Sequence, residues 1–171
     1  MILRLSEKLN SKIKAGKLKE MPLEENPYAD WTAHLFVVDR TQYIILSNTE
    51  SLYSCVMYGK GISGDGKFIE RSINTIHEFM DDDGLSDIHQ NFITPSTARV
   101  AFAKALNRKV TGSLNQLVMS TTTILKSEEI APHQVGFHLN DLLLSAIASN
   151  EDRGYGKPRE AFLRMSDRSC K

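Results

Sequence analysis

Two short apolar runs separated by a polar turn place the strongest constraint on the fold of this chain. Residues 33–38 (AHLFVV) and 43–46 (YIIL) are rich in the β-branched and aromatic residues that favour strands. Residues 39–42 (DRTQ) are short and polar, so an antiparallel hairpin is predicted over residues 33–47. Because nearly every residue of both runs is apolar, the sheet is expected to be covered on both faces, by helices or by a partner.

Further strands are predicted before and after the hairpin. Residues 1–5 alternate apolar and polar side chains as a short strand does, and Ser6 is placed to open a helix after them. Residues 52–58 fit either a third strand or a short helix, and residues 99–104 (RVAFAK) fit another strand. The predicted sheet is mostly antiparallel and includes the hairpin over residues 33–47.

Amphipathic helices are predicted to pack on this sheet. Apolar residues recur at helical spacing over residues 68–80 and again over about 114–126. Residues 135–147 are apolar and are expected to be helical at least from Asn140, while Pro158 suits the first position of a closing helix. Together these elements predict an α+β fold.

Length and composition indicate one ordinary globular domain. The chain has 171 residues, and we expect a single domain over residues 1–165 followed by a disordered tail over residues 166–171. Lys plus Arg and Asp plus Glu are both 21, so the neutral molecule has no strong field to draw it to duplex nucleic acid or anionic lipid. Its only cysteines, Cys55 and Cys170, form neither a disulfide framework nor a CxxC pair.

The N-terminal residues contain no apolar run of signal-peptide length. No stretch approaches the roughly 20 apolar residues that cross a bilayer. A cytoplasmic protein without membrane contact is therefore expected.

The stretch 107–116 (NRKVTGSLNQ) is predicted to join a strand to a helix and to be the most plausible contact site. Ser113 and Gln116 have the spacing of a capping box, and Gly112 would allow an unusual backbone angle just before the cap. The free N–H groups of a helix start attract anions, and neighbouring basic and hydroxyl side chains add donors. The predicted site for a phosphate or carboxylate consists of Asn107, Arg108, Lys109, Thr111, Gly112, Ser113 and Asn115.

A metal site is the weaker alternative. His77 and Asp81 have the i, i+4 spacing of two ligands on one helix face, in a stretch (HEFMD) that resembles HExxH with aspartate in its last position. Against this, residues 81–83 (DDD) are typical of a solvated helix end. The nearby acidic residues also lack the spacing of a calcium loop.

The remaining reactive residues select no catalytic triad. Cys55 lies in an apolar run, where a buried and inert thiol is expected. His34 alternates with apolar neighbours, which favours a structural histidine with satisfied hydrogen bonds. The glycine-rich segment Gly59–Gly66 matches neither phosphate-binding glycine motif, so it is expected to be a mobile surface loop or, alternatively, a flap over a ligand.

Several stretches resemble a small bacterial family that is known as a domain of unknown function. They are residues 29–36 (ADWTAHLF), 47–54 (SNTESLYS), 107–116 and 157–162 (KPREAF). The family carries an NRSVxGSMND-like motif, which matches Asn107, Arg108, Val110, Gly112, Ser113 and Asn115 and differs at Lys109, Leu114 and Gln116. The resemblance implies a bacterial cytoplasmic protein and supplies no activity or cofactor. Gln116 in place of aspartate argues against an acid, base or metal ligand there.

The sequence therefore favours a non-enzymatic binding or interaction domain that needs no cofactor. The 107–116 junction would contact a phosphate-bearing ligand or a protein partner, and extended duplex nucleic acid is not expected as a partner. Two alternatives remain open. One is a small metal-dependent hydrolase or nuclease using His77 and Asp81, and the other is a structural or antitoxin-like subunit, for example a homodimer, with the apolar hairpin as its interface.

Overall fold

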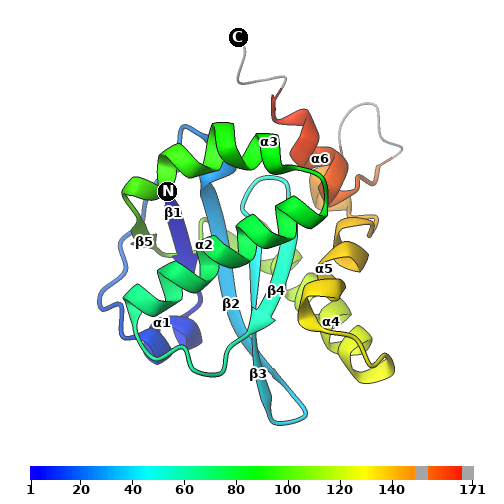
Figure 1. Ribbon diagram of the computed structural model, residues 1–171, viewed down its shortest axis with the longest axis horizontal. Coiled ribbons are helices and arrows are strands. Elements are labelled where there is room, and N and C mark those ends of the chain that lie inside the picture. The colour runs from blue at the N-terminus through cyan, green and yellow to red at the C-terminus, as the bar shows by residue number, and fades with distance from the viewer. Residues whose placement is uncertain (149–153, 167–171) are drawn as a thin grey trace.

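A five-stranded mixed sheet forms the centre of the computed structural model, which describes residues 1–148 and 154–166 (Figure 1). The strand order is β4-β3-β2-β1-β5. The two antiparallel pairings, β2 with β3 and β3 with β4, are longer than the parallel pairings of β1 with β2 and β5. The strands are β1 (Ile2–Leu5), β2 (Asp30–Val38), β3 (Thr41–Asn48), β4 (Ser54–Tyr58) and β5 (Ala101–Ala103).

Helices cover both faces of the sheet, as the continuous apolar strands require. In Figure 1 α2 crosses the front of the sheet, while α4 and α5 lie behind and beside β4. The α-helices are α1 (Glu7–Ile13), α2 (Asp65–Asp82), α3 (Ser86–Ile88), α4 (Arg108–Ser127), α5 (Pro132–Asn140) and α6 (Pro158–Arg164). Four short turns of other helix types complete the described elements: η1 (Pro27–Ala29), η2 (His89–Ile93), η3 (Thr94–Ala98) and η4 (Ser145–Ile147).

Alternate residues of the hairpin enter two separate cores. Leu35 and Ile44 join the cluster that contains Phe79 and Met80 of α2. Their neighbours Phe36 and Ile45 join the cluster formed with α4 and α5. The predicted single α+β domain with a covered hairpin is confirmed, and the helices supply the cover.

The hairpin is longer and its turn tighter than predicted. The two strands pair from Trp31 with Asn48 to Val38 with Thr41, which leaves only Asp39 and Arg40 in the turn. Both residues have positive φ, 46° and 67°, as a two-residue hairpin turn of the type I′ kind demands. The turn projects below the helices in Figure 1.

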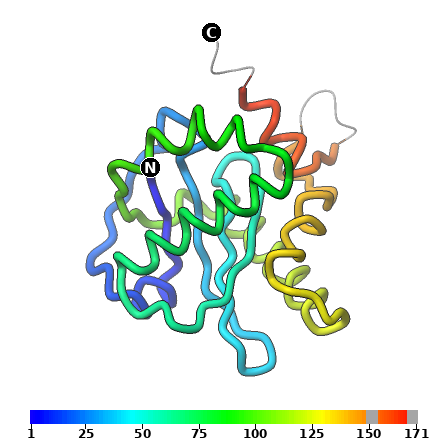
Figure 2. Tube along the Cα trace, viewed as in Figure 1, coloured from blue at the N-terminus to red at the C-terminus, as the bar shows by residue number. Residues whose placement is uncertain are grey.

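The order of the strands in the sheet reverses at β1. β1 pairs in parallel with β2 on one side and with β5 on the other, so the carboxyl ends of the three strands point the same way. The N-terminus is fixed beside the segment that leads into β5, because the Met1 ammonium group donates to the carbonyl oxygens of Ser96 at 3.0 Å and Arg99 at 2.9 Å (Figure 2). The carboxyl ends of β1 and β5 consequently lie side by side.

Most predicted helices are confirmed, and one is displaced. Ser6 caps α1, and Pro158 is the first residue of α6. The prediction of a helix from Asn140 onward was wrong, because α5 ends at that residue. Asn140 is instead committed to the edge of the sheet, where its side-chain amide bonds both the N–H of Ser54, at 2.8 Å, and its carbonyl oxygen, at 3.0 Å.

Within the described residues, no helix is long and apolar enough to span a lipid bilayer. Of the predicted tail over residues 166–171, only Ser166 belongs to the described part of the chain.

Candidate ligand-binding cleft

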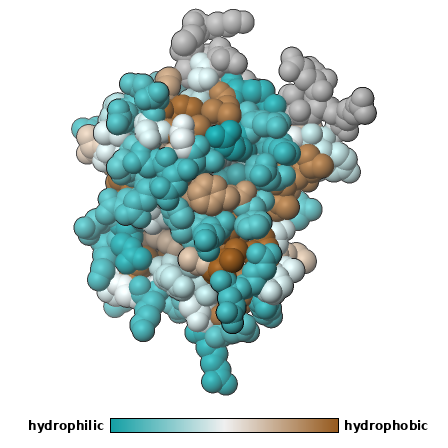
Figure 3. Space-filling view, turned by 45° about the vertical axis from the view of Figure 1, so that its right-hand side comes forward, coloured by the Kyte–Doolittle hydropathy of each residue, from teal (hydrophilic) through white to brown (hydrophobic). Residues whose placement is uncertain are grey.

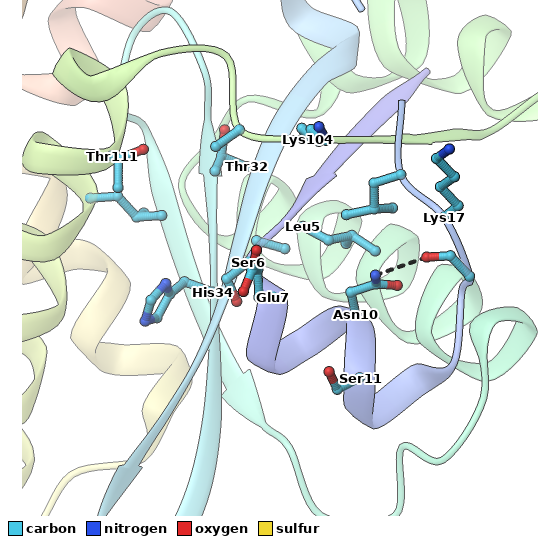
Figure 4. Close-up of a pocket in the computed structure, with 15 residues that line it drawn as sticks. Leu5, Ser6, Glu7, Asn10, Ser11, Lys17, Thr32, His34, Lys104 and Thr111 are labelled. Carbon is cyan, nitrogen blue, oxygen red and sulfur yellow. Dashed lines mark hydrogen bonds between the residues drawn. The ribbon is translucent and has the colours of Figure 1, made fainter. Parts of the chain in front are cut away.

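A cleft of about 670 Å³ opens where β1 and β5 end. It is lined by Leu5 at the end of β1, by residues at the start of α1, by Thr32 and His34 of β2, by Lys104 after β5 and by Thr111 of α4 (Figure 4). Ligands of open sheets with parallel strands bind outside the carboxyl ends of those strands, where the strand order reverses. The volume is within the usual range of small-molecule sites.

The alternation of side chains along β2 places Thr32 and His34 in the wall of this cleft. Residues alternate between the two faces of a strand, so Ala33 packs into the core shared with α2 while Thr32 and His34 face the α4 side. Ser6 continues the floor, because its N–H donates to the carbonyl oxygen of Ala33 at 3.0 Å and its hydroxyl accepts from the N–H of Leu9. The start of α1 is thereby held against β2.

A tight turn after α1 brings Lys17 to the rim. Lys14 ends the helix in the left-handed conformation, and Gly16 follows with φ of +86°, a value that favours glycine. The side-chain amide of Asn10 donates to the carbonyl oxygen of Gly16 at 2.9 Å, the interaction drawn as a dashed line in Figure 4. The turn is therefore fixed from within α1.

Basic residues gather on the side of the molecule that holds the cleft. Lys17 and Lys104 line it, and Lys104 is only loosely paired with the exposed Glu20, at 3.5 Å. The segment that contains α1 carries Lys8, Lys12, Lys14, Lys17 and Lys19. The densest acidic run lies at the opposite end of the molecule in Figure 1, at the end of α2 and in α3, and comprises Glu78, Asp81, Asp82, Asp83 and Asp87. A neutral chain thus has a basic end that attracts anions locally.

His34 is half-buried in the wall of the cleft. Burial, with a smaller effect from the positive charge of Lys8, lowers the pKa of His34 below its ordinary value, so the ring is neutral at pH 7. No hydrogen bond joins either ring nitrogen to a described residue. The described residues therefore do not supply the hydrogen bonds expected for a structural histidine, and the ring nitrogens are open to solvent.

A buried ion pair beneath the cleft was missed by the sequence reasoning. Arg4 and Asp30 are fully buried and form two hydrogen bonds, at 2.8 and 2.7 Å. The other guanidinium N–H groups donate to the carbonyl oxygens of Met21, Pro22 and Lys104, so all five donors have partners. This pair fixes the backbone that carries Lys104. The available signal was a lone arginine inside the apolar run MILRL.

The predicted cap of the 107–116 stretch was wrong. α4 begins at Arg108, six residues before the expected helix start after Ser113, and Asn107 is its N-cap, with Oδ1 accepting from the N–H of Val110 at 3.0 Å. Asparagine is as good a cap as serine, so the earlier start is available to the chain. Ser113 lies inside the helix and donates to the carbonyl oxygen of Lys109. Gly112 is an ordinary helical residue without positive φ.

A helix beginning at residue 108 distributes the predicted anion-binding residues around its surface. Thr111 faces the cleft. Asn107, Lys109 and Ser113 line a separate cavity of about 250 Å³ beside Leu52. The remaining three, Arg108, Gly112 and Asn115, are exposed and line neither of these two cavities. The seven residues therefore do not converge on one point.

The alternative metal pair is engaged with other partners. The His77 ring contacts the His89 ring in a tilted arrangement with centroids 4.6 Å apart, and Asp81 accepts a hydrogen bond from the Ser86 hydroxyl. Among the described residues, no group of three or more histidine, cysteine, aspartate or glutamate side chains is arranged to hold a metal ion. The geometry gives the predicted His77–Asp81 site no support.

The carboxylates at the end of α2 are not simply solvated, contrary to the expectation for residues 81–83. Asp82 Oδ2 lies 2.8 Å from His133 Nε2. Asp83 accepts from the Tyr53 hydroxyl at 2.8 Å and pairs with Arg159 of α6 at 3.0 Å. These contacts tie α5 and α6 to the end of α2.

Two other predictions concern Cys55 and the glycine-rich segment. Cys55 is buried as expected, and burial raises the pKa of its thiol, which keeps it protonated. The segment Gly59–Gly66 is anchored by the buried Ile62 and by a 2.8 Å hydrogen bond from Gly59 N–H to the carbonyl oxygen of Gln42. It leads into α2 and lines no part of the cleft, so a flap over this cleft is not supported.

The hairpin offers little surface to a partner. Its apolar faces are buried by helices, and Val37 is its exposed large hydrophobic residue. The face drawn in Figure 3 is mostly hydrophilic, with hydrophobic residues in separate patches. The apolar hairpin surface that the interface hypothesis requires is therefore already buried within the protein.

Comparison with known proteins places the chain in a family without assigning it an activity. The family model described as "Domain of unknown function (DUF6933)" matches residues 2–161. No curated protein matches the chain.

Proposed function

We propose that this protein, which belongs to the DUF6933 family, is a binding domain that holds a small anionic molecule in the cleft between α1, β2 and α4. The observation that carries the proposal is the placement of Lys17 and Lys104 at the rim of the largest cavity described above, beyond the carboxyl ends of β1 and β5. The ammonium groups of Lys17 and Lys104 can pair with a phosphate or carboxylate group. The bound anion would replace the weak contact between Lys104 and Glu20.

The charge distribution supports an anion over a cation. Residues 7–20 carry five lysines against two glutamates, which raises the local concentration of anions near the cleft, and Glu7 is the one acidic residue among those described that lines it. A compact ligand fits better than a long polyanion, because the whole chain is neutral and tight binding of nucleic acid needs many phosphate contacts.

Thr111 is the residue of the 107–116 stretch that would contact the ligand. Thr111 lines the cleft, and its hydroxyl oxygen can accept a hydrogen bond while its hydrogen is donated to the carbonyl oxygen of Asn107 at 3.0 Å. The exposed Arg108 near the start of α4 would act at most as a distant positive charge. No catalytic step is assigned to the cleft.

Chemical-shift mapping with phenyl phosphate tests this proposal. We expect the amide signals of Thr32, Lys104 and Thr111 to move together as the probe is added. The double variant Lys17→Met, Lys104→Met should weaken binding at least tenfold, and the matched control Lys126→Met, at the far end of α4, should not. Unchanged affinity in the double variant would remove the proposal.

A second variant separates the cleft from the start of α4. Arg108→Ala should change the affinity for phenyl phosphate by less than about threefold, as expected for a screened, exposed charge. If Arg108→Ala lowered the affinity as much as the lysine double variant does, the anion site would instead be assigned to the exposed start of α4.

A further inference from the structure

We infer that the ligand carries an uncharged hydrogen-bonding group at the end opposite its anion, and that His34 is the residue that recognises this group. The inference rests on the proposed function and deepens it. It defines the ligand class as an amphipathic anion with a carboxamide or a similar neutral donor and acceptor, joined to its anionic group by an apolar body.

The two ends of the cleft differ in chemistry. In Figure 4 Lys17 lies on one side of the cleft, with Lys104 between it and Thr32, while Thr111 and His34 lie on the other side. The second group contains no cationic lining residue, since the His34 ring is neutral. The two lysines that line the first end favour an anion there, whereas the residues that line the second end offer neutral donors and acceptors.

Among the described polar residues of the second end, His34 is the one whose donor and acceptor are both unused. The hydroxyl of Thr32 is bonded to the hydroxyl of Thr49 at 2.9 Å, and the hydroxyl of Thr111 donates to the carbonyl oxygen of Asn107. Both nitrogens of His34 lack a hydrogen bond to any part of the chain that the structure describes. The two nitrogens are therefore free to bond a ligand in the cleft, and a ligand that supplies matching groups gains affinity and selectivity over one that lacks them.

A neutral imidazole offers one donor and one acceptor, and a primary carboxamide carries the carbonyl oxygen and the N–H groups that complement them. Apolar side chains also line the cleft: Leu5 lies between Lys17 and His34 in Figure 4, and Leu18 and Leu114 are further lining residues. The ligand that satisfies all three regions has an anionic head, an apolar middle and a neutral polar end. Pockets of this type obtain affinity from apolar contact and orientation from a few polar groups.

Matched probes test this inference by isothermal titration calorimetry. The probes are phenyl phosphate and its ortho-, meta- and para-carbamoyl derivatives, which add a carboxamide at three positions. We expect at least one derivative to bind the wild-type protein five- to tenfold more tightly than phenyl phosphate. That advantage should disappear in His34→Phe, which keeps an aromatic ring, and should return at least in part in His34→Gln, which restores a donor and an acceptor.

The same experiment distinguishes failure of the inference from failure of the proposed function. If phenyl phosphate binds and depends on Lys17 and Lys104, but no carboxamide improves it, the role of His34 is overturned and the anion site stands. An advantage that persists in His34→Phe has the same meaning. If none of the four probes binds, the proposed function fails and the inference fails with it.

Discussion

Arg4 of β1 and Asp30 of the neighbouring strand β2 form a fully buried ion pair that is joined by two hydrogen bonds. The pair does more than join two strands. Through the other N–H groups of Arg4 it also holds the connection after α1 and the backbone of Lys104 at the edge of the cleft. A buried ion pair therefore holds in place the backbone segments that form the edge of the cleft.

Removing one partner of this pair should be severely destabilising. Arg4→Met leaves the Asp30 carboxylate buried without its countercharge, for which we expect a loss of about 3–5 kcal/mol in the free energy of unfolding. Urea denaturation followed by circular dichroism measures the change. The control is Lys126→Met, an exposed lysine of α4, for which a change within about 0.5 kcal/mol is expected. A loss below about 1 kcal/mol for Arg4→Met would contradict the described pair.

The position of the α4 cap predicts opposite behaviour for two side chains. Asn107→Ala removes the oxygen that accepts from Val110 N–H and should cost about 1 kcal/mol. Ser113→Ala alters a residue inside the helix, where alanine is the better helix former, and should be neutral or slightly stabilising. Thermal unfolding of both variants measures the difference. A larger loss for Ser113→Ala than for Asn107→Ala would restore the later helix start.

Two helical glycines provide a second matched pair. A Cβ atom at Gly136 would lie 2.5 Å from the Phe79 ring and 3.1 Å from the carbonyl oxygen of Ser54, so Gly136→Ala should destabilise by about 1–3 kcal/mol. At Gly112 an added Cβ meets no atom within 4 Å, and Gly112→Ala should stabilise α4 by about 0.5–1 kcal/mol. Chemical denaturation tests both changes, and equal effects at the two positions would contradict the packing of α5 on α2.

Stability should decrease as the pH falls below about 6.5, partly because of His89. Burial, with a smaller effect from His77, lowers the pKa of His89, while the nearby Asp81 opposes the shift. Between the ordinary pKa of about 6.5 and the lower folded value, the unfolded chain binds more protons than the folded one, so the free energy of unfolding decreases as the pH falls. At higher pH both states are neutral at this site and the contribution vanishes.

Replacement of the ring isolates this contribution. His89→Gln should reduce the loss of unfolding free energy between pH 7 and pH 5, measured by urea titration at each pH. The exposed His138 is the control, and His138→Gln should leave the slope close to that of the wild type. An unaltered slope in His89→Gln would assign the pH dependence to other groups, of which His34 is the first to test because its pKa is also lowered.

The fold was largely predictable where local pattern and tertiary packing agree. The continuous apolar strands of the hairpin predicted a sheet covered on both faces, and the spacing of apolar residues from Phe68 to Met80 predicted α2. The start of α4 was not predictable, because Asn107 and Ser113 are both competent caps. The packing of the helix against the rest of the protein selects between the two caps.

The cleft was less predictable than the fold because it combines residues from separated segments. The parallel placement of β1 between β2 and β5 brings Lys17, His34 and Lys104 together, and strand order of this kind depends on long-range pairing. The alternation of β2 identified the face on which His34 lies. It gave no sign that this face opens into a cavity instead of a packed core.

The most direct test of the proposed anion site is a crystal structure of the protein with phenyl phosphate bound at saturating concentration. The account predicts electron density for the phosphate within hydrogen-bonding distance of the Lys17 or Lys104 ammonium group, with the ring against Leu5 and Leu114. Density only at the exposed start of α4, or an empty cleft beside a ligand bound elsewhere, would contradict it.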